Sequence, residues 1–288
     1  MKGNESMAGI LHVLGTPIGN ISDITLRALD VLSEVDFIAA EDTRVTLKLL
    51  NKYEIKKPLV SYHDHSSRLC ADNIISRLLA GESCAVVTDA GMPCISDPGE
   101  GLVKLCYENG IQVRVVPGPS AVVSALAVSG LDTSRFSFEG FLSVTKKQRL
   151  EHLNEVKNNK NTMIFYEAPH KLLSTLKDML EYFGDRRISL CRELTKIYEE
   201  VVRCTISEAI EMYEARSPKG EFVLVIEGAP EPDSPECTIE QAVQMVRDLA
   251  EGGEKTITAC KIVAAETGYK KSELYRLVNE EADSKRIK

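Results

Sequence analysis

The segment CAVVTDAGMPCISDPG, residues 84–99, carries the main indication of how this chain folds. Its start, residues 85–87, is a short apolar run typical of a buried strand. From Asp89 onward it becomes a loop of small residues and prolines. In an open α/β sheet, ligands bind outside the carboxyl ends of the strands, where Gly91 would allow close backbone approach and Asp89 and Asp97 would place carboxylates at the rim. The same segment also fits a tight strand-to-helix turn with a capping aspartate.

The residues around this strand alternate between apolar runs and amphipathic stretches. Further strands are predicted at 10–14, 37–40, 59–61 and 112–116. Helices are predicted at 24–32, capped by Ser22 or Asp23, and at 47–50, 68–80, 102–107 and 121–128. This alternation indicates an α/β domain with a largely parallel sheet. Each predicted strand ends in a polar or Gly/Pro loop, so the functional groups are expected at one edge of the sheet.

The second half of the chain predicts another α/β domain, with a mixed or antiparallel sheet. A linker strand is predicted at 136–141, further strands at 162–166, 188–192, 198–204 and 222–226, and helices at 145–156, 171–183 and 206–214. The run APEPDSPE, residues 229–236, indicates a hinge. Helices are predicted beyond it at 239–250, 258–266 and 272–279, the last two forming a helix-turn-helix-like pair. We expect three parts: 1–118, 119–228 and 229–288.

Composition and charge narrow the class of protein. The chain has 288 residues, 43% of them hydrophobic and 27% charged, with a net charge of −8. That charge argues against a protein that coats nucleic acid by electrostatics alone. No apolar run approaches the roughly 20 residues that span a bilayer, and the N-terminus lacks the apolar core of a signal peptide, so a cytoplasmic protein without membrane contact is expected. The eight cysteines are scattered singly, which makes a disulfide framework or a zinc site unlikely on this pattern.

The loop after the first predicted strand, GTPIGN at 15–20, indicates what kind of cofactor to expect. It lacks the third glycine of the dinucleotide-binding fingerprint and the Gly-Lys-Ser/Thr of a P-loop. The loop therefore fits better a cofactor whose binding does not depend on a phosphate group. S-adenosylmethionine is one, since it needs backbone contacts to its adenine and amino acid and carboxylates or carbonyls near its sulfonium.

A set of short motifs, in this order, resembles one protein family. The motifs are TPIGN (16–20), AAEDTR (39–44), HDH (63–65), DAGMPCISDPG (89–99), PGPSA (117–121), FEGFL (138–142), FYEAPH (165–170) and RELTK (192–196). They are similar to those of the ribosomal RNA small-subunit methyltransferase I group within the tetrapyrrole methylase superfamily. The resemblance covers roughly residues 10 to 228.

The resemblance implies a fold, an activity and a set of contacts. Members look like homodimeric enzymes of two α/β domains that bind S-adenosylmethionine in the interdomain cleft. They methylate the ribose 2′-hydroxyl of a cytidine in the decoding region of small-subunit (16S) ribosomal RNA. By the same resemblance, the cofactor contacts fall on Pro17, Asp89, Ala90, Gly91, Ile95, Ser120, Ala121, Tyr166, Glu167 and Leu194. Porphyrin-modifying members carry a Gly-Asp-Pro type of loop where this chain has residues 89–93, which favours the RNA branch.

Transfer to a ribose hydroxyl requires alignment of the groups and removal of a proton. We predict that Asp64 or Glu193 lies near the acceptor and that Arg44 clamps RNA or a second subunit. No third ligand accompanies the two histidines of the HDH run, so no metal is expected.

Structural roles fit several of the same residues. Glu41 and Asp42 also fit helix-capping acids, Glu193 and Lys196 fit a surface ion pair, and Ser120 fits a helix cap. For Phe141 we favour a place in the core.

Two other functions remain open at this point. Methylation of a small molecule such as a tetrapyrrole would require an apolar trough for a macrocycle. A binding module that docks on RNA through the residues after 229 and has lost catalysis would bind the cofactor and transfer no methyl group.

Overall fold

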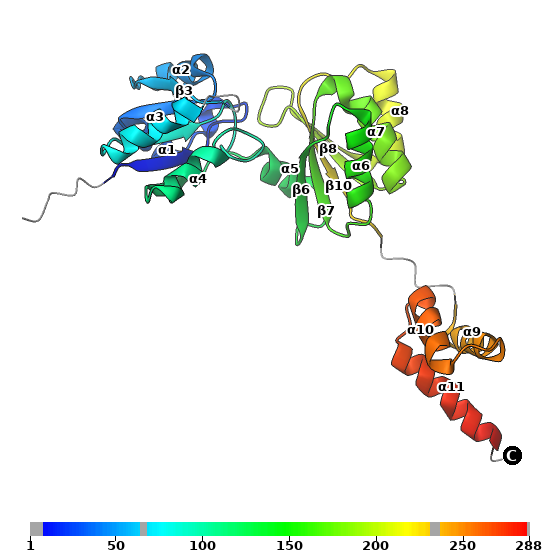
Figure 1. The fold of residues 1–288 in the computed structure, drawn as a ribbon. Helices are drawn as coiled ribbons and strands as arrows, with labels where there is room; N and C mark the ends of the chain where they lie inside the picture. Colours follow the sequence, from blue (N-terminus) through cyan, green and yellow to red (C-terminus); the bar gives the residue numbers. More distant parts are fainter. Residues whose placement is uncertain (1–7, 64–67, 231–236, 287–288) are drawn as a thin grey trace, which may run out of the picture. The chain divides into compact units, whose positions relative to one another are not determined.

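The computed structural model describes residues 8–63, 68–230 and 237–286. They form two compact units, Met1–Ala229 and Pro230–Lys288 (Figure 1). The first unit contains two five-stranded sheets and the second is helical. The α/β class predicted from the sequence is confirmed.

The first sheet is entirely parallel, with strand order β3-β2-β4-β1-β5. Its strands are β1 (Ile10–Leu14), β2 (Phe37–Ala40), β3 (Leu59–Ser61), β4 (Cys84–Val87) and β5 (Gln112–Val116). All four residues of both β2 and β4 are buried, because helices cover both faces of a parallel sheet. Central strands of this kind therefore have continuously apolar sequences.

Four helices cover the two faces of the first sheet. They are α1 (Leu26–Glu34), α2 (Thr43–Lys52), α3 (Arg68–Leu79) and α4 (Glu100–Glu108). Apolar residues of α1 and α2 pack on one face, and those of α3 and α4 pack on the other. Alternate residues of each strand enter the two cores, as the period of a β-strand requires.

The start of the first helix differs from the prediction that Ser22 or Asp23 caps it. Residues Ile21–Asp23 form a short 3-10 helix, and the cap of α1 is Thr25, whose hydroxyl accepts a hydrogen bond from the Ala28 backbone N–H. The extended backbone at Thr25 breaks the helical path, so a single helix cannot run from residue 22. Leu26 is 82% exposed, so it is not part of the apolar face.

The second sheet is mixed, with strand order β6-β7-β10-β8-β9. Its strands are β6 (Phe136–Phe141), β7 (Thr162–Glu167), β8 (Arg187–Arg192), β9 (Glu200–Thr205) and β10 (Phe222–Ile226). β6 pairs parallel with β7, and the other pairs are antiparallel. The predicted linker strand, β6, is thus an edge strand of this sheet, with a register shift between Phe138 and Gly140.

Helices cover both faces of the second sheet as well (Figure 1). They are α5 (Ala121–Ser129), α6 (Lys146–Val156), α7 (Pro169–Phe183) and α8 (Ile206–Ala215). Helix α5 packs on one face, against Ile164, Val223 and Val225. Residues of α6, α7 and α8 pack on the other face, around Phe165 and Leu224. Val122, Ala125 and Leu126 of α5 are buried against the sheet, whereas Val123 and Val128 are exposed.

The second unit is a three-helix module with its own core. It consists of α9 (Ile239–Glu251), α10 (Thr256–Thr267) and α11 (Lys271–Arg286). Thr238 and Gln241 form a capping box at the start of α9. Val246, Val263 and Leu274, one from each helix, are completely buried. The predicted pair of helices around Gly268 is therefore α10 and α11.

Three other predictions concern what the chain lacks. Among the described residues, no helix is long and apolar enough to cross a membrane. Across the same ranges no group of three or more His, Cys, Asp or Glu side chains is placed to hold a metal ion. The cysteines are free thiols, and Cys84, Cys106, Cys191 and Cys260 are buried.

A close backbone contact between two strand-end loops generates the first prediction. A Cβ atom on Gly118 would lie 2.8 Å from backbone atoms of Gly15. Gly118→Ala must push the loops after β1 and β5 apart, so we expect it to lower the free energy of unfolding by about 1–3 kcal/mol. Gly101→Ala, inside α4 with only the Tyr62 hydroxyl at 3.8 Å, is the matched control and should not destabilise the protein. Equal urea midpoints for the two variants would contradict this account.

Candidate functional site

Three loops at the carboxyl ends of β1, β4 and β5 meet at one edge of the first sheet. The Thr16 N–H donates to the Gly91 carbonyl at 2.9 Å, and the Gly91 N–H donates back to the Thr16 carbonyl at 3.1 Å. The Thr16 hydroxyl also donates to the Thr88 carbonyl at 3.0 Å. Gly91 has a φ of +87°, a conformation that other residues rarely adopt. The loop after β4 is thereby held against the loop after β1.

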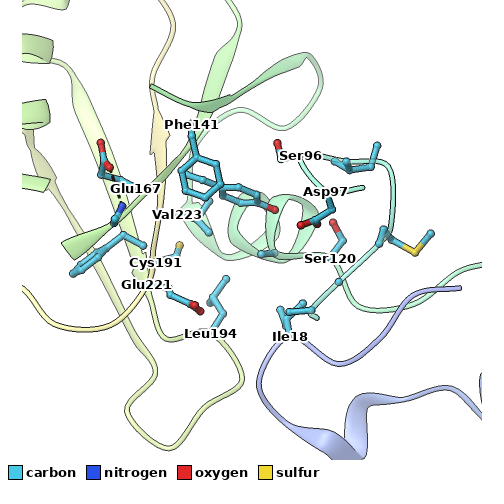
Figure 2. Close-up of a pocket in the computed structure, with 18 of the residues that line it drawn as sticks. Ile18, Ser96, Asp97, Ser120, Phe141, Glu167, Cys191, Leu194, Glu221 and Val223 are labelled. Carbon is cyan, nitrogen blue, oxygen red and sulfur yellow. Dashed lines mark hydrogen bonds between the residues drawn. The ribbon is translucent and has the colours of Figure 1, made fainter. Parts of the chain in front are cut away.

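A cavity of about 500 Å³ opens beside these loops (Figure 2). Its lining comes from the loops of the first sheet, the start of α5 and the ends of β6, β7, β8 and β10. The residues that the resemblance assigned to the cofactor and that line it are Ala90, Gly91, Ile95, Ser120, Ala121, Tyr166, Glu167 and Leu194. Pro17 and Asp89 do not line this cavity.

Apolar and aromatic side chains form much of the cavity wall. Phe141 is 56% exposed and points into the cavity, so its expected place in the core is wrong. It stands at the end of the edge strand β6, where no element covers it, and its ring lies 5.3 Å from that of Tyr166. Burial, followed by the charge of Asp97, raises the pKa of Tyr166 to about 12. The phenol is therefore neutral at pH 7 and can donate a hydrogen bond.

Two polar side chains stand together on the opposite side of the cavity. Figure 2 shows Asp97 and Ser120 close to each other and facing the space below Phe141. Ser120 occupies the N-cap position of α5, but its side chain makes no capping hydrogen bond. Its hydroxyl faces the cavity at the start of α5, and the N-terminus of a helix favours a carboxylate or another anion.

Glu167 contributes a carboxylate that is already fully partnered. The residue is 2% exposed. Its oxygens accept hydrogen bonds from the Thr175 hydroxyl at 2.5 Å and the Ala168 N–H at 2.8 Å, and the Lys171 ammonium lies at 3.3 Å. A buried carboxylate is tolerated only with such partners. Glu167 thus fixes the start of α7 against the end of β7, at the cavity wall.

A second cavity, of about 350 Å³, lies around Pro17 and Asp89. The loop after β1, one side of α2 and the loop after β4 line it. Asp89 accepts a hydrogen bond from the Asp42 N–H at 3.2 Å, and burial raises the pKa of its carboxyl. Thr88 lines the cavity while being 2% exposed, and its hydroxyl oxygen has no hydrogen-bond partner among the described residues.

The two cavities share a border that includes Ile18, Ala90, Lys196 and Glu221. The Lys196 ammonium lies 2.9 Å from one oxygen of Glu193 and 2.7 Å from one oxygen of Glu221. Burial alone would lower the pKa of Lys196, but the two carboxylates outweigh it and raise that pKa. Lys196 is therefore a fixed cation at the border.

The predicted catalytic residues lie in different places. Glu193 lines neither cavity: it accepts hydrogen bonds from Lys196 and from the Glu221 backbone N–H, and the latter lowers its pKa most. Arg44 lines neither cavity and its side chain is 87% exposed, ion-paired with Asp42 at 2.6 Å. Asp42 caps α2, which agrees with its structural interpretation. Asp64 lies outside the described residues.

The sequence analysis missed Glu221, Lys48 and Thr88. Glu221 immediately precedes β10, and the antiparallel pairing of β10 with β7 and β8 brings it to the edge where those strands end. Without the strand order, nothing distinguishes it from other exposed acids. A polar residue directly before the last apolar strand is the only local signal.

Comparison with known proteins identifies relatives of this chain. The sequence model of the family described as Tetrapyrrole (Corrin/Porphyrin) Methylases matches residues 11–210. A protein of Halalkalibacterium halodurans named ribosomal RNA small subunit methyltransferase I is 46% identical over 276 residues, covering 95% of this chain and 96% of that protein. A protein of Thermotoga maritima with the same name is 50% identical over 220 residues, covering 76% of this chain and 99% of that protein.

Solved structures of other proteins share this fold. The methyltransferase CobJ superposes with a TM-score of 0.58 at 20% identity, covering 77% of this chain and 95% of that chain. Diphthine synthase superposes with a TM-score of 0.57 at 13% identity, covering 76% of this chain and 89% of that chain. At this level of identity the likeness concerns the fold alone, and the fold by itself does not select an acceptor.

The pairing of Arg44 with Asp42 has a measurable consequence. The Arg44 guanidinium, through its hydrogen bonds, lowers the pKa of Asp42 from 3.8 to about 2. Because the folded-state pKa is depressed, the stabilisation is present above pH 3.8 and is lost as the pH falls toward 2. We expect Arg44→Gln to return the Asp42 pKa toward its ordinary value in an NMR titration, with Lys52→Gln on the same helix as the control. An unchanged pKa would show that Arg44 is not bound to Asp42 in solution.

Proposed function

This chain belongs to the tetrapyrrole methylases and, within them, to the ribosomal RNA small subunit methyltransferase I group, and we propose that it methylates the ribose 2′-hydroxyl of a cytidine in the decoding region of small-subunit (16S) RNA, with S-adenosylmethionine as donor. That it is a ribosomal RNA methyltransferase follows from its near full-length similarity to that group. One observation supports the donor most: residues from six separate motifs converge on a single cavity.

The cavity suits S-adenosylmethionine in size and in chemistry. Its volume of about 500 Å³ lies within the range of small-molecule sites. Phe141 and Ile95, exposed by 56% and 49%, offer apolar surface to an adenine. The Asp97 carboxylate suits the cationic part of the cofactor, while the start of α5 at Ser120 suits its carboxylate. The cofactor, when bound, supplies a methyl group on a positively charged sulfur.

The residues of the chain must then position the acceptor and remove its proton. A side chain at the border between the two cavities can reach both a cofactor in the first cavity and an acceptor in the second. Lys196 and Glu221 lie at that border. Glu193 acts near the acceptor through its hydrogen bond to Lys196. Asp64 stays a candidate for the proton acceptor, and Arg44, exposed on α2, stays a candidate clamp for RNA or for a second subunit.

The partners follow from the substrate. A chain of net charge −8 is poorly suited to binding naked RNA by charge alone. A site presented by the shape of an assembled small subunit would relieve that requirement. We propose that the enzyme acts in the cytoplasm, as a homodimer that widens the contact surface.

The proposed reaction is tested with labelled S-adenosylmethionine and small ribosomal subunits from cells that lack this gene. Nuclease digestion and mass analysis should find one cytidine methylated on its ribose. Label on a base, or transfer to a tetrapyrrole instead of to RNA, would contradict the proposal. Measurable cofactor binding without transfer to any acceptor would indicate a binding module.

The cofactor cavity is tested by two phenylalanines of the same strand. Phe141 and Phe136 stand at the two ends of β6, exposed by 56% and 44%, and only Phe141 lines the cavity. Because Phe141 is exposed, Phe141→Ala removes contact with a ligand and little of the core. We expect a loss of about 1–2 kcal/mol, or roughly five- to thirty-fold in the Kd for S-adenosylmethionine by calorimetry. Phe136→Ala should bind within about twofold of wild type.

If both variants bind as tightly as wild type, the cofactor does not lie against Phe141. A loss of similar size in both would point to a change in β6 itself and would equally overturn the assignment of this cavity.

A further inference from the structure

We infer that the second cavity receives the acceptor ribonucleotide and that Glu221, on the border between the cavities, takes the proton of its ribose hydroxyl. The inference rests on the proposed function and goes beyond it by naming the acceptor site and the proton acceptor. Three observations support it: the second cavity, the Thr88 hydroxyl without a partner among the described residues, and the cluster of Lys196, Glu193 and Glu221.

The second cavity offers groups that suit a nucleotide. At about 350 Å³ it has the size of a small-molecule site. Lys48 of α2 lines it, and its exposed ammonium has no ion-pair partner among the described residues. An ammonium of that kind can bind a backbone phosphate of RNA. The Thr88 hydroxyl, buried and unpartnered across the described part of the chain, provides a donor and acceptor at the cavity wall.

The position of Glu221 suits proton transfer between the two sites. It is one of the residues that line both cavities. One carboxylate oxygen, Oε2, accepts a hydrogen bond from Lys196 at 2.7 Å. The side chain is 81% exposed, so the other oxygen can face an acceptor in the cavity and later release a proton to solvent.

The neighbours of Glu221 hold it in place. Lys196 bridges Glu221 and Glu193, at 2.7 and 2.9 Å, and Glu193 accepts the backbone N–H of Glu221 at 3.0 Å. Glu193 thus fixes the start of β10 as well as the ammonium. Glu193 and Lys196 are positioning residues in this arrangement, and Glu221 is the catalytic one. A protonated lysine held by two carboxylates cannot itself accept the proton.

The step balances without a further reactant. The ribose oxygen forms a bond to the methyl carbon, while the bond between that carbon and sulfur breaks and its electron pair passes to sulfur. The hydroxyl proton passes to the Glu221 carboxylate and then to solvent. Asp89 also lines the second cavity, but it does not line the first, and its Oδ1 already accepts the Asp42 N–H.

The test measures kcat and KM for methyl transfer to small subunits, together with the Kd for S-adenosylmethionine. For Glu221→Gln we expect kcat to fall at least about a hundredfold, the usual size of general-base catalysis. The Kd for the cofactor and the KM for subunits should stay within about threefold, which also shows that the variant is folded. Glu221→Asp should recover part of the rate, and Glu211→Gln on α8 is the matched control.

Lys48→Gln separates binding of the acceptor from catalysis. We expect it to raise the KM for subunits about five- to tenfold, roughly one phosphate contact, with kcat and cofactor Kd unchanged. Lys52→Gln, one turn further along α2 and outside both cavities, is the control. Glu193→Gln should lower kcat less than Glu221→Gln does and leave the KM for subunits and the cofactor Kd unchanged, as a positioning residue would.

Three results would overturn the inference. The first is a Glu221→Gln enzyme with kcat within about threefold of wild type. The second is a Lys48→Gln enzyme that loses affinity for S-adenosylmethionine, which would make the second cavity part of the cofactor site. The third is a larger loss of kcat in Asp64→Asn than in Glu221→Gln. A wild-type enzyme that binds the cofactor and methylates no RNA would instead remove the proposed function and this inference with it.

Discussion

The structure of the site depends on backbone contact between loops that leaves no room for side chains. Thr16 and Gly91 exchange two hydrogen bonds, and Gly15 and Gly118 approach so closely that a single added carbon on either would meet backbone. These contacts join the loops after β1, β4 and β5 into one rigid edge. Both cavities are built on that edge, so the positions of their walls depend on the small size of Gly15 and Gly118 and on the positive φ of Gly91.

The second sheet contributes groups of a different kind to the same site. Strand β10 runs antiparallel to both β7 and β8. The carboxyl ends of β7 and β8 and the start of β10 therefore lie at the same edge of the sheet. Tyr166, Leu194 and Glu221 come from those three places. A parallel sheet could not bring the beginning of a strand there. The mixed sheet is therefore what allows Glu221, a residue that precedes its strand, to border both cavities.

The charged side chains Glu167 and Lys196, which line the cavities, both have partners. Glu167 is held by Lys171 and two hydrogen-bond donors, and Lys196 by two carboxylates. Asp97 stands beside the neutral phenol of Tyr166, whose high pKa reflects its burial and that neighbouring charge. The Thr88 hydroxyl and the Lys48 ammonium line the second cavity and make no hydrogen bond or ion pair among the described residues. They are groups that a ligand in that cavity can satisfy.

The sequence by itself determined the parts of this protein that are local. Continuous apolar runs and the Gly/Pro loops after them identified the strands of the first sheet, because a strand and the loop that ends it are adjacent in the chain. The resemblance of short motifs to a family, not local physics, supplied the eight residues that line the first cavity. Only the tertiary structure decided the rest. Phe141 faces a cavity because β6 is an edge strand, Asp89 and Pro17 belong to the second cavity because α2 packs beside them, and Glu221 meets Lys196 because β10 lies between β7 and β8. Those relations depend on strand order, and strand order is set by packing between residues far apart in sequence, which no local pattern records.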